Sequence, residues 1–391
     1  MKFKISLDSG IRDSASHLYE LECLLGLAIL LVYFYHVYGL TVGAAPVSTN
    51  VVMAYVVNGS TGVTLFFVLS GFLLSLPWLK YGLQQTSIRP STFSFYKARA
   101  LRILPLYLLT VLFAVVVSGK VASGLKAAVF GFVAFDIPPF SVVWWTLSTE
   151  VQFYLLLPLF FSAWFARGIY RIILLAAAAL WLYFYTANVI VDPSPGNILS
   201  FFMTKSIFAR LPAFLLGIAA ALFYLQLNER VKRPESYSTR AAVSILALLT
   251  MLVLGLVLQH AAFLGDWNAE QSWHIHHTLE AFLWSILLLI ILLSKPIAAS
   301  LLVNRPMAIA GKLSYSLYLN HVPILFYMIK YSQATMGKEA YMQSLWYYLC
   351  PIVALVVSLC AAYLTYKWIE LPFLNRKRKI STGMQSVNQT Q

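Results

Sequence analysis

The sequence predicts an all-α polytopic membrane protein with about ten transmembrane helices and with both termini in the cytoplasm. Of its 391 residues, 60% are hydrophobic and only 11% are charged, and the mean hydropathy is +0.76. Soluble domains have about 25% charged residues on average. Long apolar runs recur along the chain, and the segments between them are alternately rich and poor in Lys and Arg. These observations exclude a soluble globular fold.

The apolar runs are long enough to cross a bilayer, because a hydrocarbon core about 30 Å thick requires about 20 helical residues. The first run follows a mixed-charge segment and has no small-residue cleavage pattern, so we expect a retained span and not a signal peptide. The runs lie near residues 21–41, 60–79, 103–121, 145–166, 171–191, 206–227, 240–261, 279–295, 308–330 and 345–367.

The predicted orientation follows from the basic residues, which favour cytoplasmic loops. Segments 80–102, 167–171 and 228–240 and the C-terminal tail are rich in Lys and Arg, whereas 42–59 has no charged residue. The formal net charge of +14 therefore reflects topology. Because the basic residues are divided among short loops and form no single face, the charge does not indicate nucleic-acid binding.

Three parts are expected along the chain, since no segment is long and polar enough for a second soluble domain. They are a cytoplasmic N-terminal segment (1–20), a membrane domain (21–373) and a basic, disordered cytoplasmic tail (374–391). The cysteines, Cys23, Cys350 and Cys360, lie in or beside spans, which favours apolar packing over a disulfide framework. No internal repeat relates the two halves, which disfavours a secondary transporter and leaves it as the alternative class.

Ionisable residues inside the apolar runs are candidates for function, because a charge at mid-membrane costs about 2.5–3.5 kcal/mol on insertion scales. The candidates are Glu22, His36, Arg102, Glu150, Arg210, Glu280, His321 and Glu370.

His36 lies 14 residues after Glu22 and 11 after Leu25. At about 100° per residue these separations are close to whole numbers of turns, so the three residues share one helix face. Imidazole is the commonest general base in enzymes. The alternative is a histidine that bonds to a neighbouring span or is hydrated at the membrane interface.

Two further stretches combine charge with aromatic residues. In the stretch 144–154, Trp145 suits a membrane interface. Glu150 lies about one helical turn further into the membrane. Its carboxylate is either hydrated, or buried and paired with an imidazole or a substrate hydroxyl. In the stretch 96–107, Arg99 and Arg102 share a helix face at the cytoplasmic entrance to a span. They are either a topological anchor or a clamp for a polyphosphate, since Arg binds phosphate bidentately.

Other polar or small residues have simpler explanations. Gly62 and Gly71 in the second run are explained by close helix packing, and Ser70 is expected to form a hydrogen bond between helices. The sequence Trp-His-Ile-His-His (273–277) is expected to be a hydrated outer loop. It lacks the further ligands that would complete a zinc site, so no metal is expected.

Seven segments of the chain, in the order in which they occur, resemble the motifs of one family. This is the acyltransferase-3 family of integral membrane O-acyltransferases. The segments are Leu-Glu-Cys-Leu-Leu-Gly-Leu-Ala (21–28) followed by His36, Gly-Val-Thr-Leu-Phe-Phe-Val-Leu-Ser-Gly-Phe-Leu (62–73), Arg-Ala-Leu-Arg-Ile-Leu-Pro-Leu-Tyr (99–107), Trp-Thr-Leu-Ser-Thr-Glu (145–150), Arg-Leu-Pro-Ala-Phe-Leu-Leu-Gly (210–217), Gly-Lys-Leu-Ser-Tyr-Ser-Leu-Tyr-Leu-Asn-His (311–321) and Glu-Leu-Pro (370–372).

The resemblance implies a bacterial-type enzyme of the cytoplasmic membrane. Such an enzyme transfers an acyl group, commonly acetyl, from cytoplasmic acyl-CoA to a hydroxyl of a glycan, lipid-linked saccharide or hydrophobic metabolite. It implies His36 as the general base, with Glu150 as its partner or as a group that positions the acceptor. Arg99 and Arg102 become the residues that bind the CoA phosphates. The remaining motif residues, Glu22, Trp145, Arg210 and His321, are expected to contact substrate.

One position departs from the family pattern. The arginine that the family carries 11 residues before its histidine is Leu25 here. Three interpretations follow: another cation such as Arg102 or Arg210 supplies the charge, the donor differs, or the chain has lost catalysis. The presence of His36, Arg102, Glu150 and Arg210 favours an active enzyme.

Overall fold

The structure, a computed structural model, consists of helices and turns, with no β-strand among the residues it describes. These residues are 12–43, 47–133, 135–166, 168–187, 205–227, 236–264 and 273–376. The all-α membrane architecture expected from the sequence is confirmed. The predicted tail (374–391) and N-terminal segment (1–20) lie largely outside the described residues.

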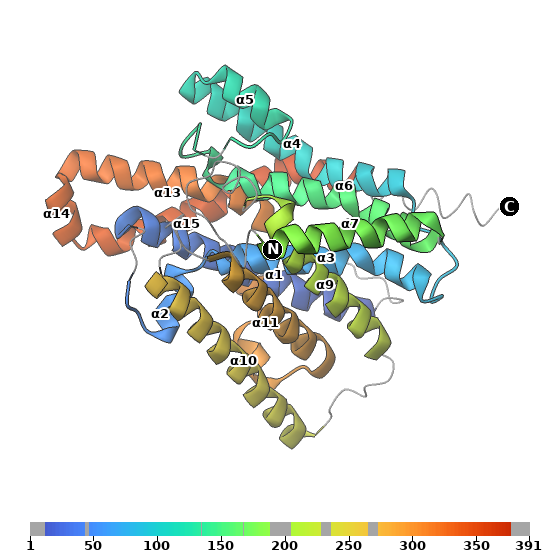
Figure 1. Cartoon of the computed structure of the whole chain (residues 1–391). Coiled ribbons are helices and arrows are strands. Elements are labelled where there is room, and N and C mark those ends of the chain that lie inside the picture. The colour runs from blue at the N-terminus through green and yellow to red at the C-terminus, as the bar shows by residue number, and fades with distance from the viewer. Residues whose placement is uncertain are drawn as a thin grey trace.

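The helices follow one another with short connections (Figure 1). In chain order they are α1 (Arg12–Thr41), α2 (Val51–Val57), α3 (Thr61–Gly82), α4 (Thr92–Ser118), α5 (Val121–Ala128), η1 (Ser141–Val143), α6 (Trp144–Ala166), α7 (Ile169–Tyr185), α9 (Ile207–Leu227), α10 (Tyr237–Leu264), α11 (Trp273–Ser294), η3 (Ile297–Leu301), α12 (Arg305–Lys312), α13 (Ser314–Met336), α14 (Lys338–Gln343), α15 (Trp346–Thr365) and the π-helical turn η4 (Tyr366–Glu370).

Within the described part of the chain, eight helical segments are long and apolar enough to cross a membrane, by length and composition. They correspond to all the predicted runs except 171–191 and 308–330. The first of these overlaps α7, which is 17 residues long. The second is divided at Leu313 into α12 and α13, and α13 carries polar side chains such as His321. The total of ten spans and the orientation stay predictions.

The helix of the third span begins earlier than the predicted apolar run (103–121) and includes the basic stretch before it. α4 begins at Thr92 because Ser91 caps it, its hydroxyl accepting a hydrogen bond of 3.3 Å from the backbone N–H of Ser94. Arg99 and Arg102 therefore lie inside one continuous helix. The separation of three residues places them on neighbouring positions of the helix surface, as expected.

Apolar side chains cover the outside of several long helices, as a lipid-facing surface requires. Val116 of α4, Leu182 of α7 and Leu248 of α10 are each more than half exposed. Figure 1 shows α13 and α15 side by side, joined by α14 at one end of the molecule, and α5 projecting from the bundle beyond α4. The three cysteines are free; Cys23 and Cys350 are buried, as their expected packing role requires, whereas Cys360 is exposed on α15.

Glycines set the closest contacts between helices. A Cβ atom at Gly71 of α3 would lie 2.2 Å from the carbonyl oxygen of Phe214 in α9, and one at Gly217 of α9 would lie 2.1 Å from that of Val68 in α3. The contact is thus reciprocal, and the two backbones meet directly. A Cβ at Gly62 would lie 2.3 Å from the carbonyl oxygen of Ala28, so the packing role expected for Gly62 and Gly71 is confirmed.

This contact leads to a stability prediction. Replacing Gly71 with leucine should lower the free energy of unfolding by about 3 kcal/mol, because the added atoms overlap backbone that cannot move without separating α3 from α9. The melting temperature in detergent measures the effect. Gly39→Ala on α1 is the matched control, since nothing lies within 4 Å of its added Cβ atom. Equal melting temperatures for the two variants would contradict the packing.

Candidate active site

His36 meets a second histidine in the interior of the bundle. His36 lies near the C-terminal end of α1 and His321 in the first half of α13, and their rings are 5.0 Å apart between centroids. Nδ1 of His36 lies 3.2 Å from Nε2 of His321 and 2.8 Å from the carbonyl oxygen of Val32. Nδ1 of His321 lies 3.0 Å from the carbonyl oxygen of Leu317. His321 is completely buried, whereas His36 is half-buried.

The carboxylate of Glu150 is held between α3 and α6. Its Oε1 accepts a hydrogen bond of 3.0 Å from the hydroxyl of Ser70 and one of 2.5 Å from the hydroxyl of Tyr154. Ser70 therefore forms the interhelical hydrogen bond expected from the sequence. No contact between Glu150 and His36 is described, so the expected pairing of the two stays a prediction.

The two arginines of α4 face different neighbours. Arg102 forms an ion pair with Glu370 of η4, with Nη1 3.4 Å from Oε2, and its guanidinium lies over the Tyr315 ring. Glu370 also accepts a hydrogen bond from Ser316. The guanidinium of Arg99 lies 5.8 Å from the centroid of the Tyr154 ring, so Arg99 is close to the Glu150 cluster.

The hydroxyl of Tyr318 connects α13 with α6. It lies 2.7 Å from Oγ1 of Thr146 and donates a hydrogen bond of 3.1 Å to the carbonyl oxygen of Val143. The Tyr318 ring also lies 5.9 Å from the ring of His321. Polar groups of α6 are thereby linked to the helix that carries the histidine pair.

Trp145 lies beside two cations at the beginning of α6. The ammonium of Lys205 is 4.6 Å from the centroid of its indole, and the guanidinium of Arg210 is 5.3 Å from it. Both distances suit cation–π contacts. Arg210, at the start of α9, is 4% exposed. The structure thus brings together two of the residues expected to contact substrate, Trp145 and Arg210.

Glu22 lies near the contact between α1 and α12. Gly311 of α12 packs against the backbone of Glu22, where a Cβ atom on Gly311 would lie 1.7 Å from the Glu22 carbonyl oxygen. The half-buried Glu22 carboxylate interacts electrostatically with Lys312. Leu25 is partly buried and packs against the hydrophobic core, as an apolar residue at this position should.

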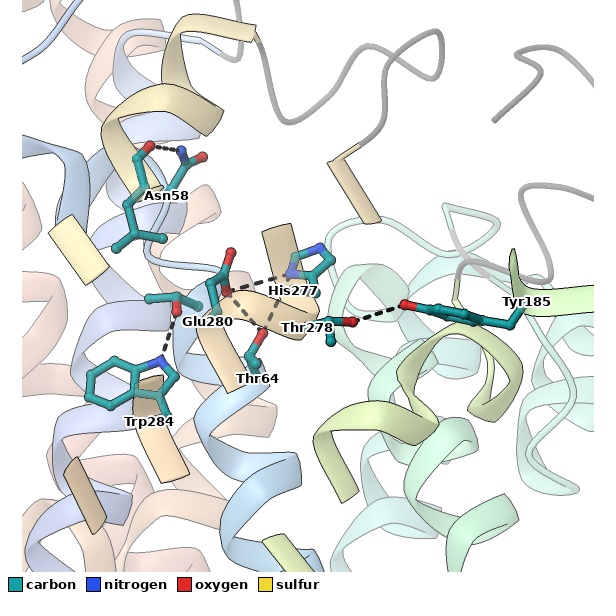
Figure 2. A network of polar contacts seen from close by, with 9 residues as sticks. Asn58, Thr64, Tyr185, His277, Thr278, Glu280 and Trp284 are labelled. Carbon is teal, nitrogen blue, oxygen red and sulfur yellow. Dashed lines mark hydrogen bonds and ion pairs between the residues drawn. The ribbon is translucent and has the colours of Figure 1, made fainter. Parts of the chain in front are cut away.

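A separate polar network joins α3 with α11 and is drawn in Figure 2. Thr64 donates a hydrogen bond of 3.1 Å to Oε2 of Glu280, and Nδ1 of His277 lies 3.5 Å from the same oxygen. Trp284 donates a hydrogen bond of 2.8 Å to Oγ1 of Thr61. Glu280 and His277 are 3% and 7% exposed, so this network lies inside the bundle.

The expectation of a hydrated loop at 273–277 is wrong for His277. Residues from Trp273 onward belong to α11, and His277 is turned into the bundle, where Glu280 lies one turn further along the same helix. The spacing of His277 and Glu280 in the sequence was the available signal for this pair. Among the described side chains, no group of three or more His, Cys, Asp and Glu residues is placed to hold a metal ion.

The fold and these clusters define a class of protein: a polytopic α-helical membrane protein with a histidine pair and several ionisable side chains inside its bundle. The chain belongs to the acyltransferase-3 family, whose model, described as an acyltransferase domain, matches residues 18–366. The resemblance found in the sequence motifs is therefore confirmed, and the protein is an integral membrane protein of this family.

Curated relatives of known name include the O-acetyltransferase OatA of Staphylococcus aureus, from strains NCTC 8325 / PS 47, COL and MRSA252. In each case the identity is 25% over 346 residues, which cover 81% of this chain and 52% of the relative. The chain thus spans about half the length of the curated relatives that it matches. No solved structure matches it.

Proposed function

We propose that the chain is a membrane O-acyltransferase that moves an acyl group, most simply acetyl, from acyl-CoA to a hydroxyl of a glycan or lipid-linked saccharide. Residues 21–373 form its catalytic membrane domain, and the bacterial cytoplasmic membrane is its site of action. The observation that carries the proposal is the half-buried imidazole of His36 inside the bundle of an acyltransferase domain. The relatives' printed name, O-acetyltransferase, supports acetyl and an oxygen acceptor.

His36 acts as the general base in this proposal. The acceptor hydroxyl attacks the carbonyl carbon of the thioester while His36 takes the hydroxyl proton. The C–S bond then breaks, the acyl ester forms, and the CoA thiolate leaves and is protonated by His36. General-base catalysis by one positioned side chain contributes about 10²–10⁴-fold in rate.

Arg99 and Arg102 bind the phosphates of the donor. They lie on one side of α4 in the half that the basic-residue pattern assigns to the cytoplasm, where acyl-CoA is found. Nε of Arg99 is buried and makes no hydrogen bond with the part of the protein that is described, so it has donor capacity left for an anion. The Arg102 side chain is 30% exposed although it pairs with Glu370, so it is not fully enclosed by the bundle.

The acceptor is assigned to the region around Trp145 and Arg210. An indole ring offers an apolar face to a sugar, and a guanidinium donates hydrogen bonds to hydroxyl or phosphate oxygens. Glu150 lies five residues after Trp145 on α6, which turns its side chain about 140° around the helix from the indole. We assign it to position the acceptor because its carboxylate is partly buried among the hydroxyls of Ser70 and Tyr154.

The donor assignment has a direct test. Arg99→Ala should raise the apparent KM for acetyl-CoA by about tenfold or more, since a hydrogen bond to a charged group contributes about 1.5–3 kcal/mol. Arg102→Lys should do the same in smaller measure, because Lys retains the charge facing Glu370 and loses the bidentate geometry. Initial rates of transfer in membranes measure both effects.

Lys97→Ala is the matched control, because Lys97 is exposed on the same helix. It should leave the KM for acetyl-CoA unchanged. If the arginine variants changed only the KM for the acceptor, the phosphate-binding role of this pair would be refuted.

A catalytically silent relative is the second candidate, and the observation that favours it is Leu25. The side chain at this position packs against the hydrophobic core and provides no charge for a donor. A silent chain would transfer no acyl group, and Leu25→Arg would restore transfer. Activity of the wild type without this substitution would exclude the candidate.

A further inference from the structure

The protonation of His321 follows from its hydrogen-bond partners. Its Nδ1 lies 3.0 Å from the carbonyl oxygen of Leu317 and 2.9 Å from that of Tyr318. Carbonyl oxygens only accept hydrogen bonds, so Nδ1 must carry the hydrogen. In the neutral ring, Nε2 then holds a lone pair. That lone pair is directed at His36, at a distance of 3.2 Å from its Nδ1.

The same reasoning fixes the protonation of His36. Its Nδ1 faces two acceptors, the carbonyl oxygen of Val32 at 2.8 Å and the lone pair of His321. Nδ1 of His36 therefore carries the hydrogen and shares it between them. In the opposite tautomer, the Nδ1 lone pair would face the Val32 carbonyl oxygen with no hydrogen between them, which is repulsive. The remaining lone pair of the neutral His36 ring is on Nε2.

The surroundings of the pair favour neutral rings. His321 is completely buried. Ring neighbours of the pair are Tyr33 of α1 and Tyr318 of α13 beside His321, and Tyr35 beside His36. In these surroundings the neutral ring of His321 can accept the His36 N–H without the cost of burying a permanent charge beside His36.

We propose that His321 is a positioning residue that, together with the Val32 carbonyl oxygen, holds His36 in the Nδ1-protonated tautomer and so presents Nε2 as the atom that takes the proton of the acceptor hydroxyl. This inference rests on the proposed function. It assigns to His321 a role other than the substrate contact expected from the sequence.

The role continues through the reaction. When the hydroxyl oxygen forms its bond to the acyl carbon, its proton moves to Nε2 and His36 becomes an imidazolium. The hydrogen bond from Nδ1 of His36 to His321 is then charge-assisted and stronger. When the C–S bond breaks, the departing thiolate takes the proton from Nε2. Both rings return to their starting tautomers, and no proton is left over.

The experiment compares wild type, His321→Leu and His321→Gln as full-length protein labelled with ¹⁵N-histidine in lipid nanodiscs. Ring ¹⁵N chemical shifts distinguish a protonated from an unprotonated nitrogen, and the spectrum of His36→Ala identifies the His36 signals. We expect Nδ1 of His36 to be protonated and Nε2 unprotonated in the wild type. In His321→Leu, the Val32 carbonyl oxygen is the one acceptor of the two that remains, so we expect a smaller fraction of His36 in the Nδ1-protonated tautomer than in the wild type.

The transfer kinetics provide a second readout. His321→Leu should lower kcat by about 100-fold, within the range of a general-base contribution, and leave the KM for acetyl-CoA unchanged. His321→Gln places an amide oxygen near the position of Nε2 and should recover a kcat within about tenfold of the wild type. Cys360→Ala, at an exposed position of α15, is the control with unchanged kcat.

A wild-type spectrum with the His36 proton on Nε2 would overturn the inference even if His321→Leu failed to fold. An unchanged kcat in a folded His321→Leu would overturn it as well. Failure of the proposed function gives a different result, namely no acyl transfer by the wild type, and the wild-type spectrum is independent of that result.

Discussion

Replacing His36 with alanine is expected to abolish acyl transfer while the protein stays folded. The rate should fall by about 10²–10⁴-fold, because the substitution removes the only group assigned to take the acceptor proton. Folding should tolerate the change, since His36 is half-buried and its partner His321 keeps its backbone hydrogen bonds to Leu317 and Tyr318. Transfer of label from radioactive acetyl-CoA, in membranes with matched amounts of protein, measures the effect.

The control for this variant is Gly39→Ala, three residues further along α1, where the added Cβ atom meets no other atom. It should transfer acyl groups like the wild type. A well-expressed His36→Ala protein with undiminished transfer would show that another group removes the proton.

The second large effect is expected at Glu150. Glu150→Leu should lower kcat/KM for the acceptor by about 100-fold, because it removes a positioning group and leaves the hydroxyls of Ser70 and Tyr154 without their acceptor. Glu150→Gln keeps an oxygen that can accept from both hydroxyls, so its loss should be about tenfold. Acceptor titrations at saturating acetyl-CoA separate the two variants.

The comparison also tests which property of Glu150 matters. If Gln were as damaging as Leu, the negative charge would be required and the hydrogen-bond role would be insufficient. If both variants kept the wild-type kcat/KM for the acceptor, Glu150 would be a structural link between α3 and α6, and its functional assignment would be wrong.

The sequence was most informative about elements set by local composition. Apolar runs of about 20 residues predict spans directly, and eight of them correspond to helices of suitable length and composition in the described part of the chain. The packing glycines and Ser70 were also predictable, since small and hydroxylated residues in a span favour interhelical contacts. The break at Leu313 was missed, although Gly311, Lys312 and Ser314 interrupt the apolar run there.

Pairings between distant spans could not be predicted from one sequence. His36 and His321 are 285 residues apart, and Arg102 and Glu370 lie on helices whose contact depends on the whole bundle. Each of the four residues was identifiable as costly inside a membrane, but its partner depends on how the helices pack. The burial of His277 was missed because its neighbours in the sequence are polar, although Glu280 follows it at helical spacing.

The structure explains how Leu25 is accommodated at a position where the family carries an arginine. An apolar side chain there is accommodated by the core, so the fold does not require the arginine that the family carries. Any cation that contributes to donor binding must then come from other helices, and Arg99 and Arg102 of α4 are the arginines we assign to it. The loss of one cation on α1 is therefore compatible with an active enzyme.

The most direct test of the central claim is acyl transfer by the wild-type chain in proteoliposomes supplied with radioactive acetyl-CoA and a saccharide acceptor, beside His36→Ala and Leu25→Arg. We expect label to enter a base-labile ester with the wild type and not with His36→Ala. Absence of label with the wild type, together with transfer by Leu25→Arg, would contradict this expectation and show that this chain kept the scaffold without the donor chemistry.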